Sequence, residues 1–192
     1  MNADDSQGLP TWGDTGTHCV TVTPLRERAD LCGFFARHFE AEWPHWYGPA
    51  RRGDAAADLD AWANRAGHLP LGVVAVDAGG APIGLAALKA TSIEAYAHVG
   101  PWAAAGYVIP DRRRGGVAAL LLSALSVEAR RLGFPAIYCA TVGAAALLAR
   151  EGWRQIDAVA HDGSTQLIFR RAVPGPGWPG VRVPFTSFGR TA

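Results

Sequence analysis

The run from 103 to 142 constrains the fold of this 192-residue chain more than any other stretch. It opens with "AAAGYVI", an apolar segment with the length and composition of a buried strand, which Pro110 ends. After "PDRRRGG", an apolar helix is expected over 117–132, and Gly133 stands where a helix C-cap is expected. A second buried strand is expected over 136–142. A strand, a turn, a helix and a strand in this order predict a mixed α/β domain.

Segments on either side extend this unit into one domain over 19–173, in which no internal repeat is visible. A polar lead-in over 1–18 is expected to be flexible. A tail over 174–192, rich in proline and glycine, is expected to pack on the surface or on a partner, which would allow a homodimer. Asp54 is a candidate helix cap, and Asp162-Gly163 is a hairpin turn signal. The other expected elements are strands over 19–25, 71–77, 82–90, 154–161 and 164–171, helices over 26–43, 55–65 and 144–151, and a loop at "PHWYGPARRGD".

Composition and charge argue against several classes of function. The net charge is +1, whereas a nucleic-acid-binding domain usually carries a stronger basic excess. No apolar run reaches the roughly 18 residues of a membrane span, and the acidic start of the chain lacks the layout of a signal peptide. The three cysteines, Cys19, Cys32 and Cys139, form no CxxC pair and no zinc pattern. We therefore expect a cytoplasmic protein with reduced thiols, no bound metal, no membrane contact and no nucleic-acid partner.

The turn "PDRRRGG" combines features that stability alone does not favour. Three adjacent arginines repel one another, and each glycine disfavours a helix by roughly 1 kcal/mol relative to alanine. A helix start, however, exposes unpaired backbone N–H groups and a partial positive charge, which together attract anions. Gly115 and Gly116 would let a phosphate approach the backbone, and Arg112 to Arg114 add forked donors suited to phosphate oxygens. The turn therefore predicts a phosphate or pyrophosphate cradle.

The turn "PDRRRGG" matches neither of two nucleotide-binding signatures, GxxxxGK(S/T) and GxGxxG. Arg113-x-x-Gly116-x-Ala118 instead resembles the (R/Q)-x-x-G-x-(G/A) signature of the GCN5-related N-acetyltransferase (GNAT) family, and "LLAREGW" resembles that family's "LYEKxGF". The order and spacing of the surrounding elements agree over about 20–172. The resemblance implies the acyl-CoA N-acyltransferase fold, a mixed and mostly antiparallel sheet with a central splayed pair of parallel strands, flanked by helices.

The resemblance also implies an activity, the transfer of an acetyl group from acetyl-CoA to a primary amine of a small molecule or peptide amino terminus. In the family the pantetheine arm docks between the two splayed strands, which here are 103–109 and 136–142. A backbone N–H at Val108 or Ile109 would hold the thioester oxygen, and Thr141 stands where many relatives place an asparagine that contacts the arm. The expected coenzyme A ligands are Val108, Ile109, Arg113, Arg114, Gly115, Gly116, Val117, Ala118 and Thr141.

Two proton transfers need side chains. Only a neutral amine attacks, so a base is required; Glu42 is the first candidate and His45 the second. Many family members carry a tyrosine acid four residues before the Gly-Phe/Trp pair, where this chain has Leu148. Tyr138 or Tyr107 would then be the substitute, unless the thiol leaves without acid catalysis. An ordinary structural role is the alternative for each of these residues.

An aromatic cluster is the candidate acceptor wall, because flat apolar rings with polar tips can hold a cationic amine. Packing in the core is the competing interpretation. Two other functions stay open: a non-catalytic acyl-CoA-binding domain, and an acyltransferase with a different thioester or aminoacyl donor. The cluster consists of Trp43, Trp46, Tyr47 and Trp102.

Overall fold

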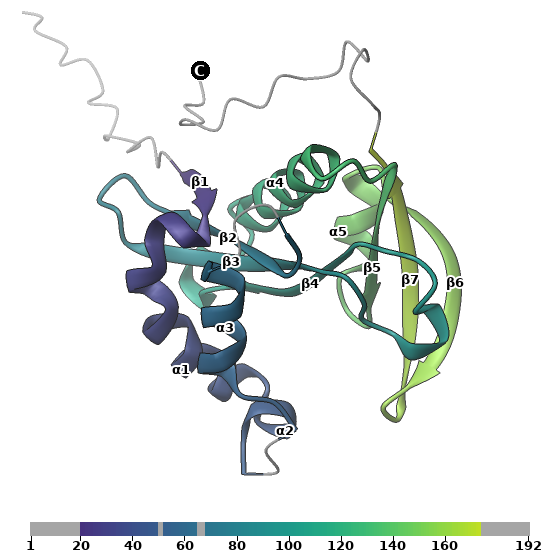
Figure 1. Cartoon of the computed structure of the whole chain (residues 1–192), viewed down its shortest axis with the longest axis horizontal. Coiled ribbons are helices and arrows are strands. Elements are labelled where there is room, and N and C mark those ends of the chain that lie inside the picture. Colours follow the sequence, from purple (N-terminus) through teal and green to yellow (C-terminus); the bar gives the residue numbers. More distant parts are fainter. Residues whose placement is uncertain (1–19, 50–51, 65–67, 174–192) are drawn as a thin grey trace, which may run out of the picture.

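The computed structural model describes residues 20–49, 52–64 and 68–173 (Figure 1). The predicted lead-in over 1–18 and tail over 174–192, and with the tail the suggested homodimer contact, lie outside these residues. The strands are β1 (Thr21–Pro24), β2 (Leu71–Val76), β3 (Pro82–Lys89), β4 (Trp102–Val108), β5 (Ala136–Thr141), β6 (Arg154–His161) and β7 (Ser164–Ala172). The helices are α1 (Cys32–Glu42), α2 (Pro44–Tyr47), α3 (Ala55–Asn64), α4 (Val117–Arg131) and α5 (Ala145–Arg150), and short 3-10 turns are η1 (Leu25–Leu31), η2 (Glu94–Tyr96) and η3 (Pro110–Arg112).

The strands form one seven-stranded sheet in the order β1-β2-β3-β4-β5-β7-β6. Every neighbouring pair is antiparallel except β4 and β5, which are parallel and are connected through α4. The sheet is therefore mixed, mostly antiparallel, with one parallel pair at its centre. The predicted architecture is confirmed.

Helices cover both faces of the sheet because the central strands are apolar on both sides. Val73 and Ala75 of β2 point into a core with Leu121 and Leu125 of α4. Their neighbours along β2, Val74 among them, point into a second core, formed with η1, α1 and α3. The alternation follows from the two-residue period of a strand. No helix in the described part of the chain is long and apolar enough to cross a membrane.

Local signals in the sequence predicted most element ends within two residues. The Asp54 carboxylate accepts a 3.0 Å bond from the backbone N–H of Ala57, so it caps α3 as expected. Gly133 follows α4 with φ +83°, a left-handed conformation suited to a helix C-cap. The loop predicted after Trp43 is wrong in part, because "PHWY" forms α2. Proline lacks the N–H that a helix start leaves unpaired and has a helical φ, so Pro44 starts a helix as readily as it ends one.

Candidate functional site

The centre of the sheet opens where β4 and β5 part. The two strands are paired only at Trp102 with Tyr138 and Ala103 with Cys139, although β4 continues to Val108. Figure 1 shows the two strands diverging beyond this point. Among the described residues, the edge of β4 that faces β5 thus has no strand partner over 104–108. Unpaired N–H and C=O groups along such an edge can bind an extended ligand as an added strand would.

A bulge in β4 widens the opening. The antiparallel register with β3 shifts between Leu85, which faces Tyr107, and Ala87, which faces Ala104. Two residues of β4 therefore stand opposite one residue of β3, and Ala105 has φ +50°. A bulge bends its strand and increases the local twist, so it directs the second half of β4 away from β5.

The backbone at the end of β4 differs from one residue to the next. The N–H of Ile109 donates to the carbonyl of Ile83 at 3.0 Å, so this amide is occupied within the sheet. Val108 stands opposite Gly84, one step along from that hydrogen-bonded pair. Because bonding alternates along an antiparallel ladder, the Val108 amide faces away from β3, toward the opening. Of the two N–H groups expected to hold the thioester oxygen, that of Ile109 is occupied within the sheet and that of Val108 is free to bind a ligand.

The start of α4 has the form of an anion cradle. Gly116 is the N-cap residue, with φ +81°, and among the described residues no side chain caps the helix. The first N–H groups of α4, at Val117, Ala118 and Ala119, are left for a ligand or water. A Cβ built on Gly116 would have no atom within 4 Å, so the space over this turn is open.

The three arginines of the turn do not act alike. Arg112 pairs with Asp77 at 3.4 Å. Arg113 donates to both carboxylate oxygens of Glu42, at 3.0 and 3.1 Å, and through Nε to the carbonyl of Val108 at 2.9 Å. Arg114 is exposed and, within the described part of the chain, forms no ion pair. Arg114 is therefore the arginine that is free to meet a phosphate, whereas Arg113 links the turn to the end of α1.

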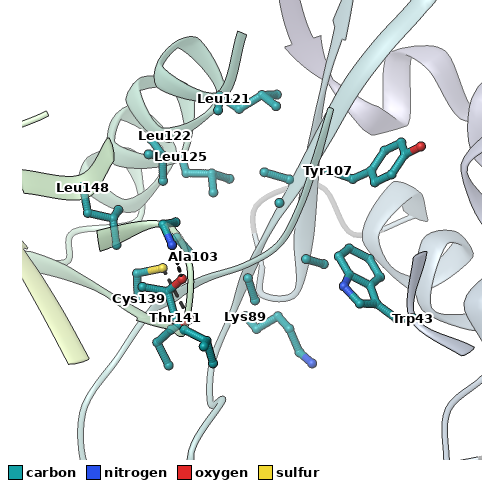
Figure 2. Close-up of a pocket in the computed structure, with 18 of the residues that line it drawn as sticks. Trp43, Lys89, Ala103, Tyr107, Leu121, Leu122, Leu125, Cys139, Thr141 and Leu148 are labelled. Atoms are coloured by element: carbon teal, nitrogen blue, oxygen red, sulfur yellow. Dashed lines mark hydrogen bonds between the residues drawn. The ribbon is translucent and has the colours of Figure 1, made fainter. Parts of the chain in front are cut away.

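A pocket of about 630 Å³ occupies the opening between β4 and β5. Figure 2 shows its two sides, with side chains of α4 and β5 at the left and aromatic side chains at the right. The left side is almost wholly apolar and includes Leu148, which is 1% exposed. Residues 103–108 of β4 line the pocket between the two sides. The lining residues from α4, from β5 and from the segment that follows β5 are Ala118, Leu121, Leu122, Leu125, Cys139, Ala140, Thr141, Val142, Ala144 and Leu147.

Two polar side chains on this side of the pocket, Thr141 and Cys139, differ in what they can contribute to chemistry. The Thr141 hydroxyl oxygen accepts a 2.9 Å bond from the Ala144 N–H, which leaves its own proton free to donate. Burial raises the pKa of the Cys139 thiol to about 12. A neutral thiol is a poor nucleophile, so Cys139 fits the structural role expected of it.

The right side of the pocket is aromatic. Trp43, Trp46 and Tyr47 line it, as expected, together with Trp62 of α3 and His45. The Tyr47 hydroxyl donates to Asp58 at 2.8 Å, and burial together with this bond raises the pKa of Tyr47 well above its usual range. The hydroxyl is therefore fixed away from proton transfer.

The tip of the β6–β7 hairpin reaches this aromatic side. Arg52, ahead of α3, pairs with Asp162 of the hairpin at 3.1 Å and lies 5.2 Å from the centre of the Trp46 ring. Figure 1 shows α2 and the hairpin tip extending in the same direction. Ser164 and Gln166 of β7 also line the pocket. The pocket is thus bounded by segments more than 100 residues apart in sequence.

Solved structures resemble this arrangement over most of the chain. An aminoglycoside 6'-N-acetyltransferase complexed with coenzyme A superposes with a TM-score of 0.65 at 14% identity, covering 81% of this chain and 98% of the other. The aminoglycoside 6'-N-acetyltransferase from Enterococcus faecium gives 0.63 at 15%, covering 81% and 98%. The protein yncA from Salmonella typhimurium, solved with its cofactor acetyl-CoA, gives a TM-score of 0.62 at 17% identity, covering 85% of this chain and 99% of the other.

The chain has the GNAT fold. No protein-family model matches the sequence, and a search of curated proteins finds no match. At such low identities the likeness establishes the fold, and the roles of individual residues depend on the geometry of this chain.

Within the GNAT fold, two predicted site residues lie elsewhere. Trp102 is fully buried, packs with Ile93 and Ile168, and donates through its indole N–H to the Val99 carbonyl at 2.9 Å. It does not line the pocket, so its assignment to the acceptor wall is corrected to the core. Tyr138 packs against the Trp102 ring, 5.6 Å between centres, and is likewise absent from the described pocket lining. Successive residues of a strand face opposite sides, and Cys139 rather than Tyr138 faces the pocket.

Glu42 lies at the edge of the site. Its carboxylate is bound by Arg113 and is not part of the described pocket lining. Tyr107 does line the pocket, and its hydroxyl lies 3.1 Å from His38 Nδ1. Burial, and then the charge of Glu42, raises the pKa of Tyr107, while Arg113 opposes the shift. Sequence reasoning missed His38, although its place one helical turn before Glu42 on α1 was a signal that could have found it.

Lys89, at the end of β3, is the second residue that sequence reasoning missed. It lines the pocket of this GNAT fold between the two sides. A lysine at a strand end is ordinarily a solvated surface residue, so the sequence alone gave it no prominence. Among the described residues, no group of three or more His, Cys, Asp or Glu side chains could hold a metal ion.

Proposed function

We propose that this protein is an N-acetyltransferase that transfers the acetyl group of acetyl-CoA to a primary amine. The observation that carries the proposal is the continuity of the site. The unpaired edge of β4 runs from the pocket to the uncapped start of α4. This path suits acetyl-CoA, whose extended arm carries a thioester at one end and a diphosphate at the other. The resemblance to acetyltransferases that bind coenzyme A or acetyl-CoA supports it.

The residues present fit the donor. The N–H groups of Val117 and Ala118, with the nearby Arg114, would hold the diphosphate, and the free edge of β4 would hold the pantetheine arm. Acetyl-CoA supplies an activated acyl group and a thiolate leaving group. An N–H on the unpaired edge of β4, one pantetheine length from the start of α4, would stabilise the oxygen on which negative charge develops, and the apolar left side would strengthen that interaction by excluding water.

The acceptor would enter from the aromatic side and lose its proton there. A C–N bond forms as the thioester C–S bond breaks, and the amine proton finally resides on the thiol. His45 lines the pocket and can accept this proton directly or through water. Glu42 remains the other candidate, acting from the edge of the site, where its contact with Arg113 ties α1 to the donor turn.

The thiolate would leave without a tyrosine acid from α5. Leu148 occupies that place and is buried among Leu121 and Leu125. A thiol with an ordinary pKa near 8.5 is a tolerable leaving group. A domain that binds acyl-CoA without turnover is the second candidate function, and the absence of a hydroxyl at Leu148 is the observation that favours it.

Two measurements test the proposal. Calorimetry with coenzyme A should show saturable binding that an Arg114→Ala variant weakens, whereas Arg150→Ala, on the outside of α5, should bind as the unaltered protein does. Thiol release from acetyl-CoA with a panel of primary amines should then show amine-dependent turnover. Binding without turnover would support the non-catalytic alternative, and no binding at all would refute both.

A further inference from the structure

Lys89 is the only lysine of the chain, which has 17 arginines. This single lysine ends β3 and lines the pocket. In Figure 2 it lies between Thr141 and Trp43, with its ammonium turned toward the Trp43 side. An ammonium is a compact point charge on a flexible stem, unlike the planar guanidinium used elsewhere in the chain. A cation of this kind is therefore placed inside the acceptor side of the site.

The ammonium has no counter-charge in the described structure. Among the described residues, none of the ion pairs involves Lys89. No Asp or Glu side chain belongs to the described pocket lining, whose other polar side chains include His45, Ser164 and Gln166. A positive charge in a partly apolar pocket is costly unless an anion accompanies it. The pocket thus presents a cation that a bound anion would neutralise.

The phosphates of the donor are not that anion. Lys89 stands opposite Trp102, at the start of β4, whereas the anion cradle follows Val108, at its end. Six residues of strand separate the two places, which corresponds to about 20 Å. The anion that Lys89 meets must then belong to the molecule on the acceptor side.

We propose that Lys89 binds a carboxylate of the acceptor, so that the preferred substrates are amino carboxylic acids, amines that also carry a carboxylate. This inference rests on the proposed function and specifies its acceptor. The aromatic side chains Trp43 and Trp46 would hold the apolar part of such a molecule. A polycationic amine is disfavoured, because its charges would face Lys89 and find no carboxylate among the described lining residues.

The test compares matched acceptors. Amino acids and ω-amino acids are assayed against their own carboxamides and against a linear polyamine, with kcat/KM measured by thiol release from acetyl-CoA. The expected result is a preference of at least about tenfold for each acid over its amide, roughly 1.4 kcal/mol. Lys89→Met should abolish the preference, Lys89→Arg should retain part of it, and Lys89→Glu should reverse it toward the amides and the polyamine.

Controls separate this inference from the proposed function. Arg150→Met changes the net charge equally but lies outside the pocket, so it should keep the preference. Coenzyme A affinity, measured by calorimetry, should be equal in the unaltered protein and in Lys89→Met. If no acceptor is turned over, the binding of each acid and its amide to the coenzyme A-loaded protein is compared by calorimetry. The acid should then bind more tightly than the amide to the unaltered protein, and equally in Lys89→Met.

Three results would overturn the inference. One is equal use or equal binding of acids and amides by the unaltered protein. Another is a preference that persists in Lys89→Met. The third is acetylation of Lys89 itself during turnover, found by peptide mapping, because an acetylated lysine carries no charge. Failure of coenzyme A to bind at all would instead refute the proposed function.

Discussion

Gly116 and Gly133 allow the anion cradle to be tested apart from the stability of α4. The two glycines flank the same helix, have φ values of +81° and +83°, and are exposed. A Cβ at either position would meet no atom within 4 Å. Replacement by alanine is therefore sterically free at both places, and its effect on folding is purely conformational.

The expected stability loss is the same for Gly116→Ala and Gly133→Ala. A left-handed conformation costs a non-glycine residue about 1–2 kcal/mol, and the stiffer unfolded chain offsets about 0.4–1 kcal/mol of this. The net loss is about 1 kcal/mol for each variant. For a chain of this size that corresponds to a fall in Tm of about 2–4 °C, measured by thermal denaturation.

Binding of coenzyme A should separate the two variants. An alanine at Gly116 places its methyl group at the N-cap of α4, where the diphosphate is expected, and affinity should fall about tenfold or more, about 1.4 kcal/mol. Gly133→Ala should bind as the unaltered protein does in calorimetry. Equal losses of affinity in both variants would show that helix stability, not the cradle, governs binding. Unchanged affinity in Gly116→Ala would refute the cradle.

Three further predictions concern other parts of the site. Trp102→Ala should lower the free energy of unfolding by about 3–5 kcal/mol in a denaturant titration, because Trp102 is fully buried. Trp46→Ala should cost far less, because Trp46 is 37% exposed. Similar losses in the two variants would contradict the assignment of Trp102 to the core. If His45 is the general base, His45→Gln should lower kcat/KM about 100-fold or more. If instead Glu42→Gln lowers kcat/KM by that factor and His45→Gln leaves it unchanged, Glu42 is the general base. Because desolvation raises the pKa of the Cys139 thiol to about 12, alkylation of Cys139 should be slow at pH 8 and should increase with pH in peptide mapping. Rapid labelling at pH 8 would contradict the raised pKa.

Much of the fold was predictable from local chemistry. Apolar runs of strand length, the helix cap at Asp54, the C-cap at Gly133 and the hairpin turn at Asp162-Gly163 each act over a few residues, and each has the predicted form. The glycine and arginine turn likewise predicted the anion cradle at the start of α4, which the open N-cap supports. The helix at "PHWY" was missed because the same proline is compatible with a helix start and a helix end.

The sequence by itself determined the order of elements, the apolar faces and the turn that precedes α4, because these depend on backbone conformation and on neighbours within a few residues. Only the tertiary structure decided which side chains share the pocket. The pairing of β4 with β3 and β5 places Trp102 in the core, with Tyr138 packed against it. The folded chain also directs the Val108 amide toward the opening and brings Arg113 to Glu42 and Lys89 to the aromatic side. A shift of one residue along a strand reverses the face of every side chain, and for strands joined by long connections, as β4 is to β3 and β5, the register is decided by packing in the folded chain.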